Sequence, residues 1–343
     1  MNFIRRITCL LLLVCFGLTA EKTATAQVLD RVYDKAGDSV SGEVMQTSKQ
    51  GVTLKRAGNT QNFAAGDILK IMHEGDPPPL TKARESALDG QYDQALNDLK
   101  NVNFGAISRP IIEADARFYV VLCESKLALA GKGKKDEAAN KALKFVTTYR
   151  DTWHFFETAK LLGDLSLAQN DFAGALRYYR SLMGAPSADT KIESVYLQGL
   201  VHLKQGDHAA ALTEFEKVIG LKAQTTQTAR LQILSKAGKA VALAQSDKAA
   251  DGLTLVKGLI AELNPTDVEM SARIYNAQGA SYEASGDTEG AILAYLHTHL
   301  MFSTQPDAHA EALKKLIELW PQVGKPERAA AARQELQQRY PGY

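Results

Sequence analysis

The histidines are the first side chains to consider for chemistry, because imidazole serves both as a metal ligand and as an acid or base near neutral pH. Seven of them are scattered along the 343 residues, and the two closest in sequence are His297 and His299. Residues two apart on a helix point about 200° away from each other. This pair cannot hold one metal ion between its own side chains, so the sequence predicts no metal site.

Motifs for catalysis are missing as well. The chain contains no Gly-x-Ser-x-Gly nucleophile elbow, no Gly-x-x-x-x-Gly-Lys phosphate loop, no His-Glu-x-x-His pair and no paired-cysteine metal motif. The acidic residues are spread over predicted helices, where they are expected to solvate an exposed face. We therefore expect no catalytic residues, no cofactor and no enzyme activity, with an enzyme that lacks a recognisable motif as an alternative.

The other reactive or aromatic side chains lie in apolar sequence and are expected to be structural. Cys123 ends an apolar run that begins at Val120, so we expect a buried thiol. The aromatic cluster of residues 153–156 and Trp320 could form a ligand platform, but aromatic residues at helical spacing usually fill a core. None of these side chains is predicted to carry a function.

The first residues have the organisation of a secretory signal peptide. Two arginines precede an apolar run over residues 7–18, and the small-x-small sequence of residues 24–26 follows it. We expect cleavage after Ala26 and a mature protein that is exported, to the periplasm or beyond. Lipidation of Cys15 is a further alternative, but Val14 occupies the position where a small residue is expected.

The charge balance argues against a nucleic-acid partner, and the hydropathy argues against a membrane-spanning segment. Lys and Arg number 40 against 39 Asp and Glu, and the densest basic stretch, residues 132–135, is followed at once by two acidic residues. Nucleic-acid binding normally requires a clustered basic excess, so no nucleic-acid partner is expected. No apolar stretch after the leader approaches the ~20 residues of a membrane-spanning helix, so no transmembrane segment is expected.

Residues 27–75 alternate apolar and polar side chains between short turn sequences. This pattern predicts four or five short strands in a small all-β domain, and we interpret it as an SH3-like barrel. Three consecutive prolines then predict a stiff linker over residues 76–79. Beyond residue 80 the apolar residues recur at helical spacing, so the fold class is mainly α.

Four segments of the helical region share one template. A turn residue and a polar residue are followed by an alanine, and a large apolar side chain comes four positions after that alanine. The alanines are Ala95, Ala175, Ala211 and Ala291, and the large side chains are Leu99, Tyr179, Phe215 and Tyr295. A glycine stands twelve residues before three of the alanines, at Gly163, Gly199 and Gly279, where we expect it to contact the alanine across a helical hairpin.

This template resembles the tetratricopeptide repeat family. The resemblance implies an α-solenoid of about seven helical hairpins over residues 80–343, with a concave face that binds a protein or peptide. The first helix of each hairpin would line this groove. The positions implied in the clearest repeats are Lys160, Asp164, Tyr196, Leu200, Lys204, Arg273, Asn276, Ala280 and Glu283. Lys160 is followed by Asp164, so the Lys-x-x-x-Asn carboxylate clamp of the chaperone-binding members is not reproduced.

The functional hypothesis is an exported protein-protein interaction scaffold that binds a peptide or partner protein in the solenoid groove. The leader suggests association with complexes of the cell envelope. The alternative is a cell-wall or glycan-binding module in which the N-terminal β domain makes the contact and the solenoid acts as a spacer.

Overall fold

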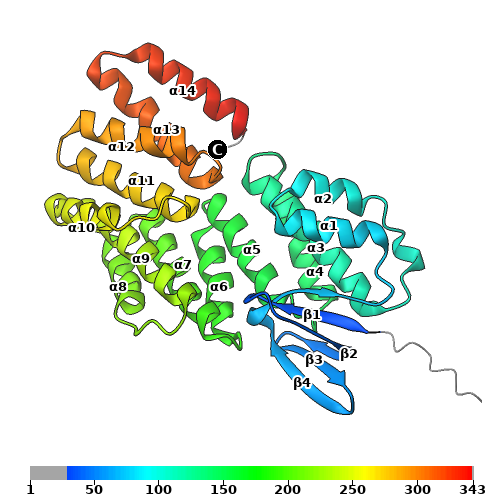
Figure 1. Ribbon diagram of the computed structural model, residues 1–343. Helices are drawn as coiled ribbons and strands as arrows, with labels where there is room; N and C mark the ends of the chain where they lie inside the picture. Colours follow the sequence, from blue (N-terminus) through cyan, green and yellow to red (C-terminus); the bar gives the residue numbers. More distant parts are fainter. Residues whose placement is uncertain (1–28, 342–343) are drawn as a thin grey trace, which may run out of the picture.

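The computed structural model describes residues 29–341, and the predicted signal peptide over residues 1–26 lies outside the described residues. Within this range a small antiparallel sheet of five strands is followed by fourteen α-helices (Figure 1). The predicted fold class, a mainly α solenoid preceded by a small β unit, is confirmed. No helix among the described residues is both long enough and apolar enough to cross a bilayer.

The five strands pair in the order β4-β3-β2-β1-β5, and all neighbours are antiparallel. They are β1 (Asp30–Asp34), β2 (Ser39–Ser48), β3 (Gly51–Arg56), β4 (Asn59–Ala64) and β5 (Ile68–Met72). One face of the sheet buries Val32, Leu54 and Ile71 completely, as the alternating sequence requires. The SH3-like interpretation of this sheet stays a prediction.

The helices form seven consecutive hairpins, numbered here one to seven. They are α1 (Pro78–Leu88) with α2 (Tyr92–Leu99), α3 (Pro110–Leu129) with α4 (Lys135–Thr148), α5 (Phe155–Ala168) with α6 (Phe172–Ser181), α7 (Ala188–Gln205) with α8 (His208–Ile219), α9 (Thr226–Ala244) with α10 (Ala249–Ala261), α11 (Val268–Ala284) with α12 (Thr288–Met301), and α13 (Pro306–Leu319) with α14 (Pro326–Arg339). The first helix begins inside the expected proline linker. Pro78 and Pro79 occupy its first turn, where proline's missing N–H removes no hydrogen bond.

The repeat template marks the contacts inside each hairpin. Ala175, Ala211 and Ala291 are fully buried, as predicted for close helix packing. The nearest neighbour of each template glycine is the ring that follows the expected alanine by one turn. A Cβ placed on Gly199 would lie 2.6 Å from the ring of Phe215, and one on Gly279 would lie 2.6 Å from the ring of Tyr295.

The ring of Phe215 also links two hairpins. A Cβ placed on Gly238, in the first helix of hairpin five, would lie 2.5 Å from the same ring that faces Gly199 in hairpin four. Phe215 is therefore held between two glycines from consecutive hairpins and is completely buried. The glycines are needed because a side chain at either position would occupy the space of the ring.

The polar residue of the template begins the second helix of a hairpin. The side chains of Asp171, Asp207 and Asp287 each accept a hydrogen bond from the backbone N–H three residues later, at 2.8–3.0 Å. This is N-capping, which satisfies a donor that the helix itself leaves unpaired. Gly206 and Gly286 precede two of the caps with positive φ angles of 84° and 77°, so the turn needs glycine there.

An ion pair between a buried carboxylate and a partly exposed guanidinium joins the sheet to the solenoid. The guanidinium of Arg109 donates from Nη1 and Nη2 to the two carboxylate oxygens of Asp30 at 2.6 and 2.8 Å. Asp30 lies at the start of β1, whereas Arg109 directly precedes α3. Trp153, expected to be structural, packs into the apolar core of the sheet and is 6% exposed. The sheet is thus fixed against hairpins two and three.

A second buried network lies beside this pair. Arg84 of α1 is completely buried and binds Asp76 at 2.9 Å and Asp115 of α3 at 2.5 Å. His154 places Nε2 2.8 Å from the other oxygen of Asp115. Cys123 on the same helix as Asp115 is also buried, and burial raises the pKa of its thiol to about 12. An unreactive thiol agrees with the structural role expected from the sequence.

The solenoid curves until its end meets its beginning. The turn between α3 and α4 contains Gly131, and a Cβ placed there would lie 2.8 Å from the backbone of Tyr340, just beyond α14. In Figure 1 the end of α14 lies near this turn. The chain just beyond hairpin seven therefore touches the turn of hairpin two.

The glycine-ring contacts predict that adding one methyl group changes the stability in opposite directions at Gly199 and at Gly258. Replacing Gly199 with Ala should destabilise the protein by about 1–3 kcal/mol, because Phe215 is held by Gly238 on its other side and cannot move away. Gly258 lies on the exposed face of α10 with no neighbour within 4 Å of an added Cβ. Gly258→Ala is the matched control and should stabilise by about 0.5–1 kcal/mol. Urea unfolding midpoints measure both, and equal midpoints for the two variants would contradict the packing described.

The Asp30 and Asp115 carboxylates predict loss of stability in acid. Burial alone raises their pKa values, but Arg109 acting on Asp30 and Arg84 acting on Asp115 hold both pKa values well below the usual range. A lowered pKa gives stability that is present above the unfolded value of about 4 and is lost as the pH falls below it. Thermal unfolding midpoints should therefore drop steeply below pH 4.

Asp30→Asn separates this effect from general acid denaturation. The variant should lose about 1.5–3 kcal/mol at pH 7, the cost of a charge-assisted hydrogen bond, and should show a shallower fall in acid. Asp93→Asn is the control, because Asp93 pairs with Lys132 at the surface and is 64% exposed. A wild-type acid profile in Asp30→Asn would show that this carboxylate does not contribute.

Candidate functional site

The inner face of the solenoid is formed by the first helix of each hairpin. In the second half of the array α7 packs against α9, α9 against α11, and α11 against α13, while each second helix packs mainly within its hairpin and on the next first helix. Residues on the free side of the first helices therefore come together although they are far apart in sequence. The resemblance implied this arrangement for the groove positions.

One hollow of about 80 Å³ lies on this face and is called the inner hollow here. All of its lining residues belong to α7, α9, α11 and α13. They are Tyr196, Leu200, Leu203, Leu234, Ala237, Gly238, Val241, Arg273, Asn276 and Glu311. Four of the nine predicted groove residues are among them: Tyr196, Leu200, Arg273 and Asn276.

Two buried oxygens in the lining have unused hydrogen-bonding capacity. The hydroxyl of Tyr196 and the amide oxygen of Asn276 have no hydrogen-bond partner among residues 29–341. The amide nitrogen of Asn276 is satisfied, since it donates to the carbonyl of Ala308 at 2.9 Å and to Glu311 at 3.3 Å. Leaving a buried polar atom unpaired costs about 1–3 kcal/mol, so pairing of these two atoms with water or with a ligand is favourable.

Burial also changes the pKa values of two groups around the inner hollow. It raises the pKa of Tyr196 to about 12, so the phenol stays protonated and can donate at neutral pH. It raises the pKa of Glu311 as well, although the neighbouring Arg273 and the hydrogen bond from Asn276 act in the opposite direction. The hollow thus combines a phenol donor, an amide acceptor and a carboxyl group with an apolar wall of leucines.

Arg273 is held in place by carboxylates. Its Nε lies 3.2 Å from Glu269, one turn earlier on α11, and its Nη2 lies 2.8 Å from Asp307 at the start of α13. Burial lowers the pKa of Arg273, but Asp307 and Glu269 outweigh burial and raise it further above its usual range. The guanidinium is permanently charged and neutralised within the protein, so it acts as a fixed donor.

Lys160 and Asp164 form a separate charged cluster. Lys160 lies 3.6 Å from Asp164 on the same helix and 3.7 Å from Glu193 of α7. Asp164 also accepts a hydrogen bond from Tyr179 at 2.7 Å. The carboxylate of Asp164 raises the pKa of Lys160 above its usual value. These two predicted residues link hairpins three and four and do not line the inner hollow.

The other three predicted groove residues lie outside the inner hollow. Lys204 donates to the carbonyl of Leu167 at 3.1 Å, near the end of α5. Glu283 pairs with Lys315 of α13 at 3.0 Å. Ala280 is half-buried in the same helix as Glu283. All three are outside the set of residues that lines the inner hollow.

Sequence reasoning missed the contributions of α9 and α13. Leu234, Ala237 and Val241 come from hairpin five, which lacks the template, and Glu311 comes from the last hairpin. One signal was available: Gly238 interrupts an otherwise apolar helical pattern, and it proves to lie where α9 meets the ring of Phe215. Gly238 thus lies both against the packed ring and in the lining of the inner hollow.

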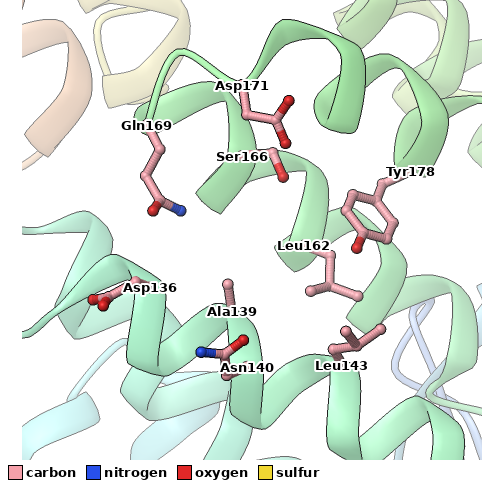
Figure 2. Close-up of a pocket in the computed structure, with 9 residues that line it drawn as sticks. All are labelled: Asp136, Ala139, Asn140, Leu143, Leu162, Ser166, Gln169, Asp171 and Tyr178. Atoms are coloured by element: carbon pink, nitrogen blue, oxygen red, sulfur yellow. The ribbon is translucent and has the colours of Figure 1, made fainter.

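A larger hollow of about 260 Å³ lies between α4 and hairpin three and is called the outer hollow. Figure 2 shows α4 on one side of it and α5 and α6 on the other. Its lining includes Leu143, which is 44% exposed, together with Leu162 and Tyr178. Asp171, also in the lining, already caps α6. None of the predicted groove residues lies there.

Comparisons with solved structures identify the architecture. The chain is similar to a tetratricopeptide repeat protein from Parabacteroides merdae, with 15% identity over 76% of this chain and 91% of that chain and a TM-score of 0.51. It also matches the apo form of RapI with 12% identity, 76% and 74% coverage and a TM-score of 0.46. A tetratricopeptide repeat protein of Cytophaga hutchinsonii, matched through its C-terminal part, gives 14% identity, 76% and 95% coverage and a TM-score of 0.40.

The first of these comparisons, together with the repeat geometry, shows that the helical region has the tetratricopeptide repeat fold. No protein-family model matches the chain. No curated protein matches it in sequence. The fold is therefore assigned by structure alone.

The unpaired hydroxyl of Tyr196 predicts that its removal does not harm the free protein. Tyr196→Phe should leave the urea unfolding midpoint unchanged or raise it, because a buried hydroxyl without a partner is lost. Tyr179→Phe is the matched control, since that hydroxyl donates to Asp164, and it should cost about 1 kcal/mol. If Tyr196→Phe destabilises the protein as much as Tyr179→Phe, the hydroxyl has a structural partner.

Proposed function

We propose that this protein is an exported scaffold without catalytic activity, and that it binds an extended peptide segment of a partner protein in the inner hollow. The observation that carries the proposal is the pair of buried, unpaired oxygens of Tyr196 and Asn276 within the lining of the inner hollow. A peptide backbone presents both a donor and an acceptor in each amide group, so it can pair with a phenol donor and an amide acceptor.

The size of the hollow favours part of a long ligand over an enclosed small molecule. Small-molecule pockets usually have volumes of about 300–1,000 Å³, whereas the inner hollow has about 80 Å³. Leu200, Leu203 and Leu234 line it. We propose that one apolar side chain of the peptide enters between these leucines while its backbone runs along the inner face.

The charges of the inner face do not select the partner by simple attraction. Lys160, Lys204 and Arg273 each bind an oxygen of the protein itself. Reversing these three charges would break internal contacts, so such a variant would not isolate partner binding. Because the binding groups we propose are a phenol, an amide and leucines, binding should depend only weakly on salt concentration.

Export and association with cell-envelope complexes are part of the same proposal. They rest on the leader pattern of residues 1–26 in the printed sequence. Fractionation of the native cells, followed by mass spectrometry of the mature N-terminus, tests this part. A mature chain that begins at Gln27 supports export, and an unprocessed chain in the cytoplasm contradicts it. Glycan binding by the sheet stays a prediction that no contact in the described region addresses.

A matched pair of leucine variants tests the groove. Leu200→Glu places a charge in the apolar wall of the inner hollow and should weaken partner capture from an envelope extract at least tenfold, about 1.4 kcal/mol. Leu293→Glu is the control, because Leu293 is 60% exposed on the outward side of α12. Circular dichroism first establishes that both variants are folded. Equal capture by the two folded variants would place the binding surface elsewhere.

A further inference from the structure

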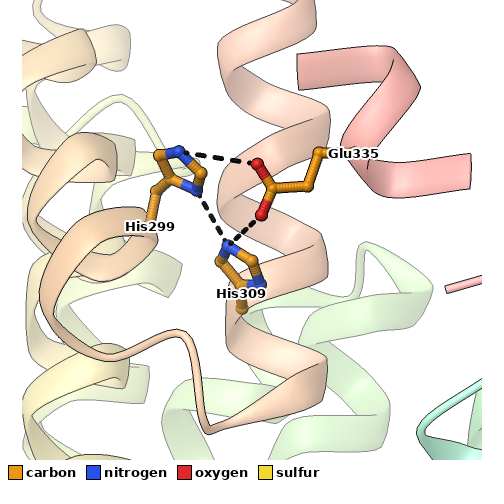
Figure 3. A group of neighbouring side chains, drawn as sticks. All are labelled: His299, His309 and Glu335. Carbon is orange, nitrogen blue, oxygen red and sulfur yellow. Dashed lines mark hydrogen bonds and ion pairs between the residues drawn. The ribbon is translucent and has the colours of Figure 1, made fainter. Parts of the chain in front are cut away.

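Three side chains from three consecutive helices meet near the C-terminus. Figure 3 shows His299 of α12, His309 of α13 and Glu335 of α14 pointing toward one another. Nδ1 of His299 lies 2.8 Å from Nε2 of His309. The carboxylate of Glu335 lies 3.8 Å from Nε2 of His309 and 3.9 Å from Nε2 of His299. One ligand atom from each residue lies within 4.8 Å of the others.

Tyr340 holds His309 in one orientation. Its hydroxyl lies 2.7 Å from Nδ1 of His309, and the imidazole ring is completely buried. When Nδ1 carries the proton and donates it to this hydroxyl, the lone pair of Nε2 points toward His299 and Glu335. A histidine ligand whose second nitrogen is fixed by a hydrogen bond is the usual arrangement in metal sites.

We propose that His299, His309 and Glu335 bind one divalent transition-metal ion, of which Zn²⁺ is the best fit, and that solvent completes the coordination. Two imidazoles and one carboxylate are a ligand set that zinc accepts. His299 and Glu335 have side chains that are 21% and 33% exposed, which leaves a side open to solvent. None of these three residues lines the inner hollow, so the metal site is independent of the proposed function.

The observed distances are close to those that coordination requires. Zinc bonds of about 2.0–2.2 Å at tetrahedral angles place ligand atoms about 3.3–3.5 Å apart. The two imidazole nitrogens, Nδ1 of His299 and Nε2 of His309, are 2.8 Å apart, and Oε1 of Glu335 lies 3.8 Å from Nε2 of His309. These two separations lie on either side of the required value, and the three ligand atoms lie within 4.8 Å of one another, so small side-chain rotations bring them into place. When Nε2 of His309 is the acceptor, Nδ1 of His299 carries the proton between them. A change of tautomer moves that proton to Nε2 and frees the Nδ1 lone pair.

The surroundings favour zinc-like ions over calcium or magnesium. Ca²⁺ and Mg²⁺ require a shell of oxygen ligands, and two of the three ligand atoms here are imidazole nitrogens. Arg339 lies 3.1 Å from Oε1 of Glu335 and adds a positive charge nearby. That charge opposes any cation, so only a metal that binds imidazole strongly should bind. Arg339 also restrains the Glu335 carboxylate beside His309.

Metal binding would connect the last two hairpins of the solenoid. His299 belongs to hairpin six, whereas His309 and Glu335 belong to hairpin seven. The hydrogen bond to Tyr340 extends the connection to the point where the chain contacts Gly131 of the first turn of hairpin two. A bound ion should therefore stabilise the closed curve of the array.

Titration of Zn²⁺ into the full protein without an affinity tag, after treatment with EDTA, tests the proposal. Isothermal titration calorimetry should show one saturable site, and one equivalent of Zn²⁺ should raise the thermal unfolding midpoint in an EDTA-reversible manner. His299→Ala and Glu335→Gln should each lower the affinity at least tenfold, in line with loss of a ligand. His297→Ala is the matched control, because His297 lies on the same helix but stacks on Tyr275 with ring centroids 4.6 Å apart.

Co²⁺ provides a second measurement that needs no variant. The wild-type protein with one equivalent of Co²⁺ should show the intense visible absorption of a four- or five-coordinate ion, and Zn²⁺ should displace it. The weak spectrum of hexahydrated Co²⁺ in the wild type overturns the proposal. Unchanged Zn²⁺ affinity in folded His299→Ala and Glu335→Gln overturns it too, as does an equal loss of affinity in His297→Ala.

Discussion

The structure depends on the packing of a large side chain against a glycine within and between hairpins. Each hairpin of a solenoid is too small to bury its own apolar surface, so it is stable only when the next one covers it. Phe215 meets this requirement directly, because its ring contacts Gly199 in its own hairpin and Gly238 in the following one. The spacing of the first helices, and therefore the shape of the inner hollow, follows from how closely these glycines allow the helices to approach.

Much of this arrangement is encoded locally and could be predicted. The Gly-Asp turn of hairpins four and six predicts both the end of one helix and the cap of the next, because Asp207 and Asp287 act on donors only three residues away. The alternating residues before the prolines predicted strands for the same local reason. The ring that lies nearest to each glycine was not predicted. A one-dimensional spacing cannot show whether an alanine or the ring one turn later lies opposite.

The candidate site was predictable only where the repeat is regular. Tyr196, Leu200, Arg273 and Asn276 were found because hairpins four and six keep the template, whereas Leu234 and Glu311 belong to hairpins that do not. The histidine cluster shows a different limit. His299 has its neighbour on the next helix, ten residues away, and the carboxylate of Glu335 comes from a third helix. Contacts between helices depend on the superhelical path, which no local pattern reports.

The contact between Gly131 and Tyr340 has a consequence for the route by which a ligand reaches the inner face. A solenoid whose two ends stay apart admits a folded domain from the side, but here the residues just beyond α14 touch the turn of hairpin two. Separation of this seam, the contact between Tyr340 and Gly131, would widen the way to the inner face for a bulky ligand. Residence time would therefore be governed by the lifetime of this seam, in addition to the strength of the contacts made inside.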